Sequence, residues 1–308
     1  MLGPELSMDA PRIYRVSTAD PITLFGLCRE SMPHFLSRFS ALHPEQSIFG
    51  AFIDHLRHVH FTSNALLTVL VLAVLFTVFR YILQYATKSW VRHHHVSPLY
   101  SHKIAEAVWK LAYYGSAWLF ALFIHYNELP TFSDPLSMWD DWKNGTKPAY
   151  KPPVVVLYAI QTGFYTHSLW ATLYMDQWRS DSIIMLVHHF VAIALLALSY
   201  VDNYTLAGAL VFLLQDNSDA ILEIAKLCVY LKKRTNGDFY PSLDLAGKVI
   251  LQIFGIVWMI FRLYWFPCKL LYACLYGGVY LGPQDSPVFS IIGSLLILLY
   301  FLNVFWFN

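Results

Sequence analysis

Charge is scarce in this sequence. Asp, Glu, Lys and Arg make up 13% of its 308 residues, about half their share in an ordinary soluble domain, while 57% of the residues are hydrophobic. This composition excludes a disordered chain and argues against a soluble globule. With 21 basic and 20 acidic side chains, the formal net charge is +1. No overall field therefore attracts a polyanion, and we expect no nucleic-acid partner.

The sequence lacks the motifs of common metal-dependent enzymes and of serine hydrolases. The four cysteines show no CxxC or other metal-ligand spacing, which predicts free thiols. The sequence has no HxxxH or HxxHH series of the kind that a membrane di-iron desaturase needs, and no GxSxG motif of a serine hydrolase. We therefore expect an activity that uses no metal ion.

Long apolar runs and aromatic residues are abundant instead. Aromatic residues reach 17%, as is typical of chains whose rings line membrane interfaces. A spanning helix needs about 20 mostly apolar residues, because the bilayer core offers the backbone no hydrogen-bond partners. Seven stretches meet this requirement, so the sequence predicts an all-α, polytopic integral membrane protein. The predicted spans lie near residues 61–82, 107–126, 154–175, 183–200, 206–231, 249–265 and 288–307.

The orientation of the spans follows from Lys and Arg, which concentrate in cytosolic loops. They cluster after the first, third and fifth predicted spans, beginning with a basic linker over residues 83–102. The loop after the second span carries the sequon Asn144-Gly145-Thr146, which fits a lumenal face. We therefore expect the N-terminal tail, residues 1–60, in the lumen and the C-terminus in the cytosol.

Ionisable residues inside the predicted spans are the strongest functional signal, because they are costly in lipid and usually face the interior of a helix bundle. His188 and His189 lie in the middle of the fourth span. Asp216 and Asp219 begin an acidic stripe at helical spacing in the fifth span. Three neighbouring spans thus present polar faces, since the third contributes Gln161, Tyr165, His167, Ser168 and Thr172.

Structural explanations compete for several of these residues. Glu223 and Lys226, near the expected cytosolic end of the fifth span, are typical of a salt-bridged network. His167 is equally consistent with a hydrogen bond between helices. Arg262 in the sixth span is consistent with a side chain that snorkels to the interface. The paired histidines and the deeper aspartates are harder to explain in this way.

Paired imidazoles and carboxylates suit acyl transfer. Near neutral pH an imidazole acts as a general base or a nucleophile, and a neighbouring carboxylate fixes its tautomer and stabilises the imidazolium. A thioester donor suits this inventory, because its thiolate leaves readily whereas an attacking amine must first lose a proton. A proton-coupled transporter would also have His and Asp inside a bundle, although the sequence shows no inverted repeat.

Five segments together resemble the Lag1 motif and TLC domain of ceramide synthases. In chain order they read FYTHS (164–168), YMDQWRSD (174–181), HH (188–189), DNSD (216–219) and FRLYWFP (261–267). The resemblance implies a six-helix TLC bundle over residues 103–308, preceded by one extra helix. The chain lacks the homeodomain-like segment that many animal members insert after the first span, which resembles the branch that prefers stearoyl-CoA.

The resemblance implies a multi-pass enzyme of the endoplasmic reticulum that N-acylates sphinganine or sphingosine with a fatty acyl-CoA. The products would be ceramide or dihydroceramide and CoA, with no cofactor. The catalytic positions of the family correspond to His188, His189, Asp216 and Asp219. The family often has a His just before the first aspartate, where this sequence has Gln215, which cannot titrate. The implied substrate-binding residues are Tyr165, His167, Ser168, Trp178, Arg179, Asn217 and Arg262.

Two mechanisms fit these residues. In the first, His188 attacks the thioester to form an acyl-imidazole, Asp216 polarises the His pair, and His189 and Asp219 bind and deprotonate the sphingoid amine. In the second, both histidines act as bases in a direct transfer. The alternative function is a non-catalytic protein of the same fold that binds or transfers lipids. The expected partners are acyl-CoA, the sphingoid base and membrane lipids, and a homo- or heterodimer is compatible with the sequence.

Overall fold

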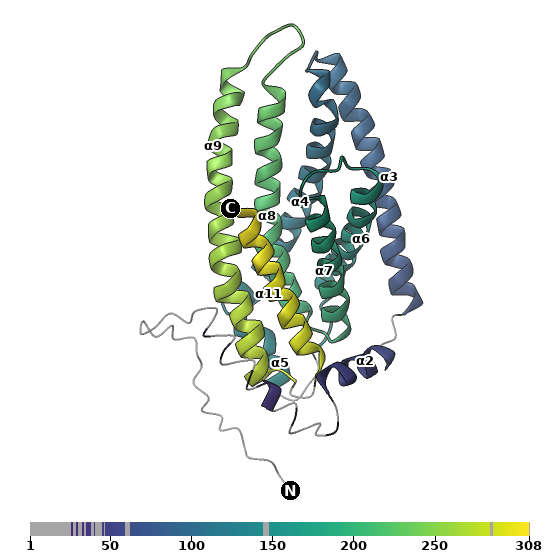
Figure 1. Ribbon diagram of the computed structural model, residues 1–308, viewed down its shortest axis with the longest axis vertical. Helices are drawn as coiled ribbons and strands as arrows, with labels where there is room; N and C mark the ends of the chain where they lie inside the picture. Colours follow the sequence, from purple (N-terminus) through teal and green to yellow (C-terminus); the bar gives the residue numbers. More distant parts are fainter. Residues whose placement is uncertain are drawn as a thin grey trace.

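The computed structural model describes residues 26, 29, 33, 35–37, 40, 45, 47–58, 62–143, 148–283 and 286–307. The sequon at 144–146 and most of the expected lumenal tail lie outside these residues. Long helices run roughly parallel to one axis of the molecule (Figure 1). The long elements are α3 (Ser63–His93), α4 (Ser101–Asn127), α6 (Pro152–Tyr174), α7 (Ser182–Val201), α8 (Thr205–Leu231), α9 (Pro241–Trp258), η4 (Met259–Gly277) and α11 (Val288–Phe307). The short ones are α2 (Ile48–His58), η1 (Pro98–Tyr100), η2 (Pro130–Phe132), η3 (Pro135–Trp139), α5 (Asp140–Lys143) and α10 (Gly278–Leu281).

Each of the seven predicted spans overlaps, over most of its length, one helix or one continuous helical run. Five helical segments among the described residues are long and apolar enough to cross a membrane: α3, η1 with α4, α7, the continuous run from α9 to α10, and α11. The helices α6 and α8 are 23 and 27 residues long but fall outside this group. They carry the polar stripes, which lower their hydropathy. The protein is therefore an all-α, multi-pass membrane protein.

Two helices extend beyond their predicted ends. The first continues as α3 to His93, so the expected linker over 83–102 begins as helix and the charged Arg80 lies well inside α3. Asp176, from the segment after α6, pairs with the buried Arg80 guanidinium, which removes the reason for the helix to end there. The sixth helix continues through η4 and α10 to Leu281. The helix thus runs well past residue 265, where the predicted span ends, and η4, a π-helix, contains Pro267.

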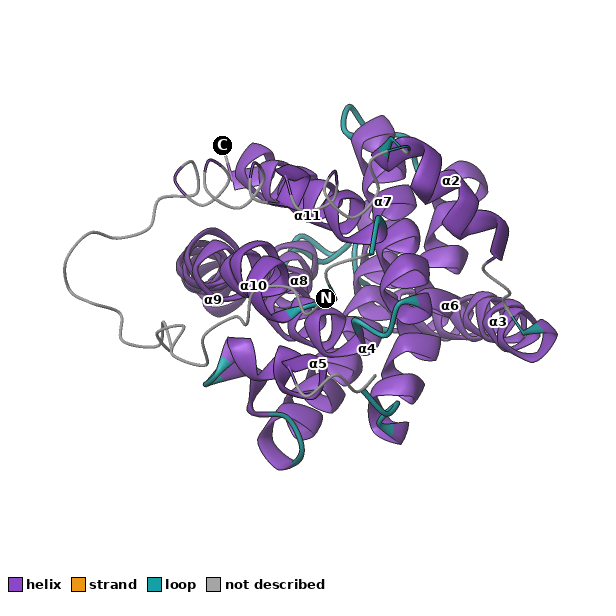
Figure 2. Ribbon diagram, turned by 90° about the horizontal axis from the view of Figure 1, so that it is seen from below, coloured by secondary structure: helices purple, strands orange, loops and turns teal. Residues whose placement is uncertain are grey.

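The polar helix α8 lies at the centre of the bundle. It packs along α4 on one side and α9 on the other, and also contacts α6, α7 and η4. Helix α3 lies at the outer edge against α4 and α6, as the end-on view in Figure 2 shows. The basic loops after α3 and α8 meet at one end of the bundle, where the Thr235 amide donates to the His95 carbonyl over 2.8 Å. This meeting agrees with the prediction that these two loops share one side of the membrane.

The contact between α3 and α6 depends on a glycine. A Cβ atom on Gly163 would lie 2.6 Å from the Cβ of Leu72, an atom fixed to the backbone of α3. Small residues let transmembrane helices approach closely in this way. We expect Gly163→Ala to force the two helices apart and to lower the free energy of unfolding by about 1–3 kcal/mol.

Thermal unfolding of the purified protein in detergent measures this effect. Gly115→Ala in α4 is the matched control, because nothing lies within 4 Å of its added Cβ. Alanine is the better helix former by about 1 kcal/mol, so the control should be neutral or stabilising. Equal midpoints for the two variants would contradict the close packing of α3 and α6.

Candidate active site

Two cavities of different character meet inside the bundle. A polar cavity of about 350 Å³ and a narrow apolar slit of about 70 Å³ share His188, Asp219 and Arg262 as lining residues. A ligand that reaches from one cavity into the other must pass these three side chains. An imidazole, a carboxylate and a guanidinium therefore converge at this junction, and these groups can act as a nucleophile, a base or a binding site for charge.

Charged residues from several helices line the polar cavity. In α4, Glu106 accepts a hydrogen bond from Lys110 over 2.6 Å and pairs with Arg179 at 3.2 Å. In α8, Lys226 donates to Glu223 over 2.7 Å, which confirms a salt bridge between these two residues. The cavity thus reaches the segment between α6 and α7, and its walls suit a polar, charged ligand.

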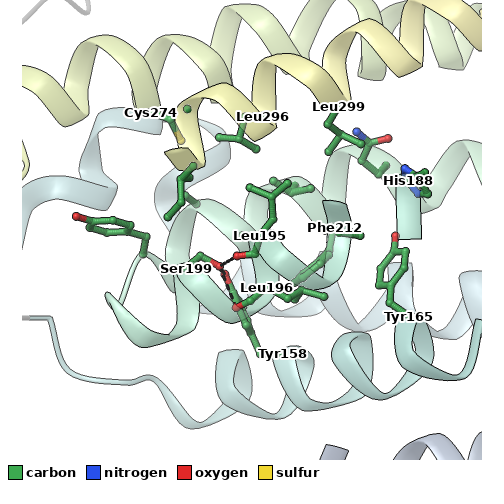
Figure 3. A pocket seen from close by; sticks show the side chains of 18 of the residues that line it. Tyr158, Tyr165, His188, Leu195, Leu196, Ser199, Phe212, Cys274, Leu296 and Leu299 are labelled. Atoms are coloured by element: carbon green, nitrogen blue, oxygen red, sulfur yellow. Dashed lines mark hydrogen bonds between the residues drawn. The ribbon is translucent and has the colours of Figure 1, made fainter. Parts of the chain in front are cut away.

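The apolar slit runs from the histidines toward the opposite end of the bundle. Figure 3 shows Tyr165 and His188 at one end and Cys274 toward the other, with Leu296 between them. Trp139 also lines the slit, and its indole donates a hydrogen bond to the Ala273 carbonyl over 2.8 Å. The walls are formed largely by aliphatic and aromatic side chains, which favours a hydrocarbon ligand.

The two histidines face different surroundings. His188 is half-buried, lines both cavities, and lies against the Trp306 ring with centroids 5.3 Å apart. His189 is buried, lines the polar cavity alone, and its Nδ1 lies 3.5 Å from the Thr172 hydroxyl. The Nδ1 atom of His188 is buried without a hydrogen-bond partner. Successive helical residues point about 100° apart, which accounts for the separation of the two rings.

The two aspartates of the motif are also separated. Asp216 is 1% exposed and lines neither cavity. Its Oδ2 accepts a hydrogen bond from the Gln161 amide over 2.6 Å, and Gln161 in turn accepts from the Tyr113 hydroxyl over 2.9 Å. Asp219 lies at the junction of the cavities and pairs with Arg262 at 2.7 Å. Neither carboxylate is hydrogen-bonded to a histidine in this structure.

Arg262 is buried rather than directed to the membrane interface, so the snorkelling explanation is wrong. The residue is 3% exposed, and its Nε donates to the Ser218 hydroxyl over 2.7 Å. Its other nitrogens donate to the Asn303 side chain and to the Gln215 carbonyl. The guanidinium also lies over the Trp258 ring, 4.0 Å from its centroid. Arg262 thereby joins η4 to α8 and α11, which supply its hydrogen-bond partners. A charged side chain inside a membrane protein needs such partners.

The structure separates the remaining candidates into two groups. Ser168 and Arg179 line the polar cavity and Tyr165 lines the slit, whereas His167, Asn217 and Trp178 line neither. His167 is buried with its Nδ1 2.8 Å from the Thr77 hydroxyl of α3, as expected of a hydrogen bond between helices. Asn217 is buried and accepts from the Ser218 amide, and Trp178 is 58% exposed. In the part of the chain that the structure describes, no three His, Cys, Asp or Glu side chains are grouped to hold a metal ion.

Comparison with known proteins identifies the family of the chain. A family model described as TLC domain matches residues 103–308. Ceramide synthase 1 of Homo sapiens is 38% identical over 213 residues, which cover 69% of this chain and 60% of the human protein. Ceramide synthase 1 of Mus musculus is 35% identical over 252 residues, or 81% of this chain and 71% of the mouse protein. Ceramide synthase LOH1 of Arabidopsis thaliana is 30% identical over 211 residues, covering 66% and 64%.

This chain belongs to the Lag1/TLC ceramide synthase family. Its match spans 60% of the length of the human ceramide synthase 1. In this chain, Gln215 occupies the position where, by the sequence resemblance, the family often has a His. Its side chain is buried and lines the slit beside the junction.

Several residues of the polar cavity are not predicted from the sequence. Glu106 and Lys110 lie four residues apart where a predicted span begins, so charge at the edge of a span is a signal that points to them. Trp306 has no such signal, because an aromatic residue in an apolar span is ordinary. Only the packing of α11 against α7 reveals that Trp306 covers His188.

Proposed function

We propose that the protein is a sphingosine N-acyltransferase of the endoplasmic reticulum membrane that joins a fatty acyl group from acyl-CoA to the amine of sphinganine or sphingosine. The position of His188, where a polar cavity meets an apolar slit, carries this proposal. Acyl-CoA has a charged nucleotide at one end and a hydrocarbon chain at the other, with the thioester between them. With the thioester at the junction, each end lies in the cavity of matching polarity.

His188 is the nucleophile in the first step. An imidazole nitrogen attacks the thioester carbonyl carbon, a carbon–nitrogen bond forms, and the carbon–sulfur bond breaks. CoA leaves as a thiolate into the polar cavity, whose charged walls include Lys110, Arg179 and Lys226. The acyl chain stays in the slit. His188 is favoured over His189 for this role because it alone of the two lines both cavities.

His189 is the base in the second step. Asp219 at the junction attracts the sphingoid ammonium group electrostatically, and His189 removes a proton from it. The neutral amine attacks the acyl carbon, the bond to His188 breaks, and ceramide leaves. The nitrogen gives up a second proton as the amide forms. One of the two protons passes to the CoA thiolate and the other is released to water, so the reaction yields ceramide, CoA and a proton. Asp216 lines neither cavity, and its contribution passes through Gln161 and the packing of α8 on α6.

The direction of access follows from the charges. The polar cavity includes Arg179, in the segment between α6 and α7, which we expect on the cytosolic side together with the other basic loops. Acyl-CoA would then enter from the cytosol, with the N-terminal tail in the lumen. The short connection between α3 and α4 supports a preference for stearoyl-CoA, because it resembles the branch of the family with that preference.

The acyl-imidazole is tested by mass spectrometry of the purified protein after incubation with acyl-CoA alone. We expect an added acyl mass on the peptide that contains His188, and mild hydroxylamine should remove it, because an acyl-imidazole is an activated acyl group. A mass that stays unmodified would exclude the covalent step. Ceramide formation in the same sample would then favour direct transfer with both histidines as bases, and no ceramide would favour a lipid-binding protein.

A further inference from the structure

The side-chain amide of Gln215 is the most unusual polar group in the slit. Gln215 is 6% exposed and lines the slit beside His188. Both atoms of its amide, Nε2 and Oε1, are buried without a hydrogen-bond partner. Its backbone is fixed, since the carbonyl oxygen accepts a hydrogen bond from Arg262 over 2.7 Å. The residue is thus held firmly while its side chain is left unpaired.

A second buried glutamine shows what the same side chain does in a structural role. Gln161 is fully buried, and its amide is bonded on both sides, to Tyr113 and to Asp216. An unpaired buried amide is destabilising relative to an apolar side chain of the same shape, because it loses water and gains nothing in exchange. Buried polar groups without a partner are rare and call for an explanation.

The position along α8 identifies the ligand atom. Gln215 lies about one helical turn before Asp219 along α8, and both residues line the slit, so the amide lies on the same face of α8 as the junction. The carbon that is bonded to His188 in the proposed mechanism lies at the junction, and its hydrocarbon chain runs away from the junction along the slit. Tyr165 lies on the other side, and Figure 3 shows its hydroxyl directed toward His188. The only oxygen that an acyl chain brings to the junction is that of its carbonyl group.

We infer that Gln215 Nε2 donates a hydrogen bond to the carbonyl oxygen of the acyl group and stabilises the negative charge that this oxygen gains during acyl transfer. This inference rests on the proposed function. When the nitrogen of His188 bonds to the acyl carbon, the π electron pair of the carbonyl moves onto the oxygen. When the pair returns, the thiolate is expelled. The amide keeps its protons throughout, so it stabilises the oxyanion without taking part in proton transfer.

The test compares a substitution of Gln215, expected to lower kcat, with the same substitution of Gln161, expected to lower the thermal midpoint. Gln215→Met keeps the shape of the side chain and removes the donor. We expect kcat for ceramide formation to fall by about 10²–10³, as for the loss of an oxyanion donor, with KM for acyl-CoA nearly unchanged. The thermal midpoint should stay the same or rise. Gln161→Met should lower the midpoint, because it leaves Asp216 unpaired.

Two further measurements make the outcome decisive. Gln215→His restores a donor and should recover most of kcat. An S-alkyl-CoA thioether, which has no carbonyl oxygen, should bind equally to the wild type and to Gln215→Met. Gln215→Met with wild-type kcat, or with a loss of kcat that follows a lower thermal midpoint, would overturn the inference. A wild-type protein that makes no ceramide would overturn the proposed function and this inference together, so the two failures are distinguishable.

Discussion

Replacing His188 by Gln is expected to reduce ceramide formation by at least about 10³-fold, since it removes the group that carries the acyl chain and acts at the reacting carbon. Among the described histidines, His188 alone lines both the polar cavity and the apolar slit. Gln preserves much of the volume against Trp306, so the fold and the binding of acyl-CoA should be retained. Formation of ceramide from acyl-CoA and sphinganine measures the loss, with the amount of folded protein measured in parallel.

His167→Gln is the matched control for this experiment. His167 is also a buried histidine of the bundle, but it lines neither cavity and is hydrogen-bonded to Thr77 of α3. We expect the control to lower the thermal midpoint while turnover per folded molecule stays within a few-fold of the wild type. A His188→Gln protein that keeps a tenth or more of the wild-type turnover would refute the role of His188 as the nucleophile that carries the acyl group.

Arg262→Met is expected to have the largest effect on stability. The substitution removes a buried guanidinium that bonds Ser218, Asn303, Gln215 and Asp219, and it leaves the Asp219 carboxylate without its partner. Breaking a buried pair from one side costs about 3–5 kcal/mol. For a protein of this size, we expect the thermal midpoint to fall by about 10 °C. Differential scanning fluorimetry in detergent measures the shift.

Arg179→Met provides the comparison for Arg262. The Arg179 side chain is 50% exposed and pairs with Glu106 at 3.2 Å, so its loss should cost no more than about 1 kcal/mol. Adding Asp219→Asn to Arg262→Met should recover part of the lost stability, because the unpaired carboxylate is then gone. Equal effects of the two arginine substitutions would contradict the view that Arg262 joins η4 to its neighbours.

The sequence predicts the helices well because the requirement on a spanning segment is local. Each span must satisfy its own backbone hydrogen bonds, and about 20 apolar residues reveal it. The ends of the helices depend on distant residues and are therefore harder to predict. Arg80 indicates the end of a span when read alone, yet Asp176, 96 residues later, neutralises it inside the bundle. In the same way, no local pattern predicts that the helix beginning with α9 continues past Pro267.

The candidate site is predictable in its residues and only partly in its geometry. His188, Asp219 and Arg262 are ionisable residues in apolar segments, which is a strong signal, and they meet at the junction of the cavities. The same signal points to Asp216 and His167, which the bundle buries outside both cavities. Helical spacing shows which residues share a face of a helix. Whether that face lines a cavity or packs against another helix depends on how the helices pack, which the spacing does not show.

The central position of α8 also bears on how the protein enters the membrane. Residues 205–214 of α8 are mostly apolar, but Asp216 and Asp219 follow in the middle of the helix. An aspartate at the centre of a spanning helix costs about 2.5–3.5 kcal/mol to insert, and Arg262, the partner of Asp219, is synthesised only later, in η4. A newly made α8 is therefore a poor membrane span by itself. We expect it to stay beside the translocon until η4 emerges, so that α8, α9 and η4 enter the bilayer as one unit.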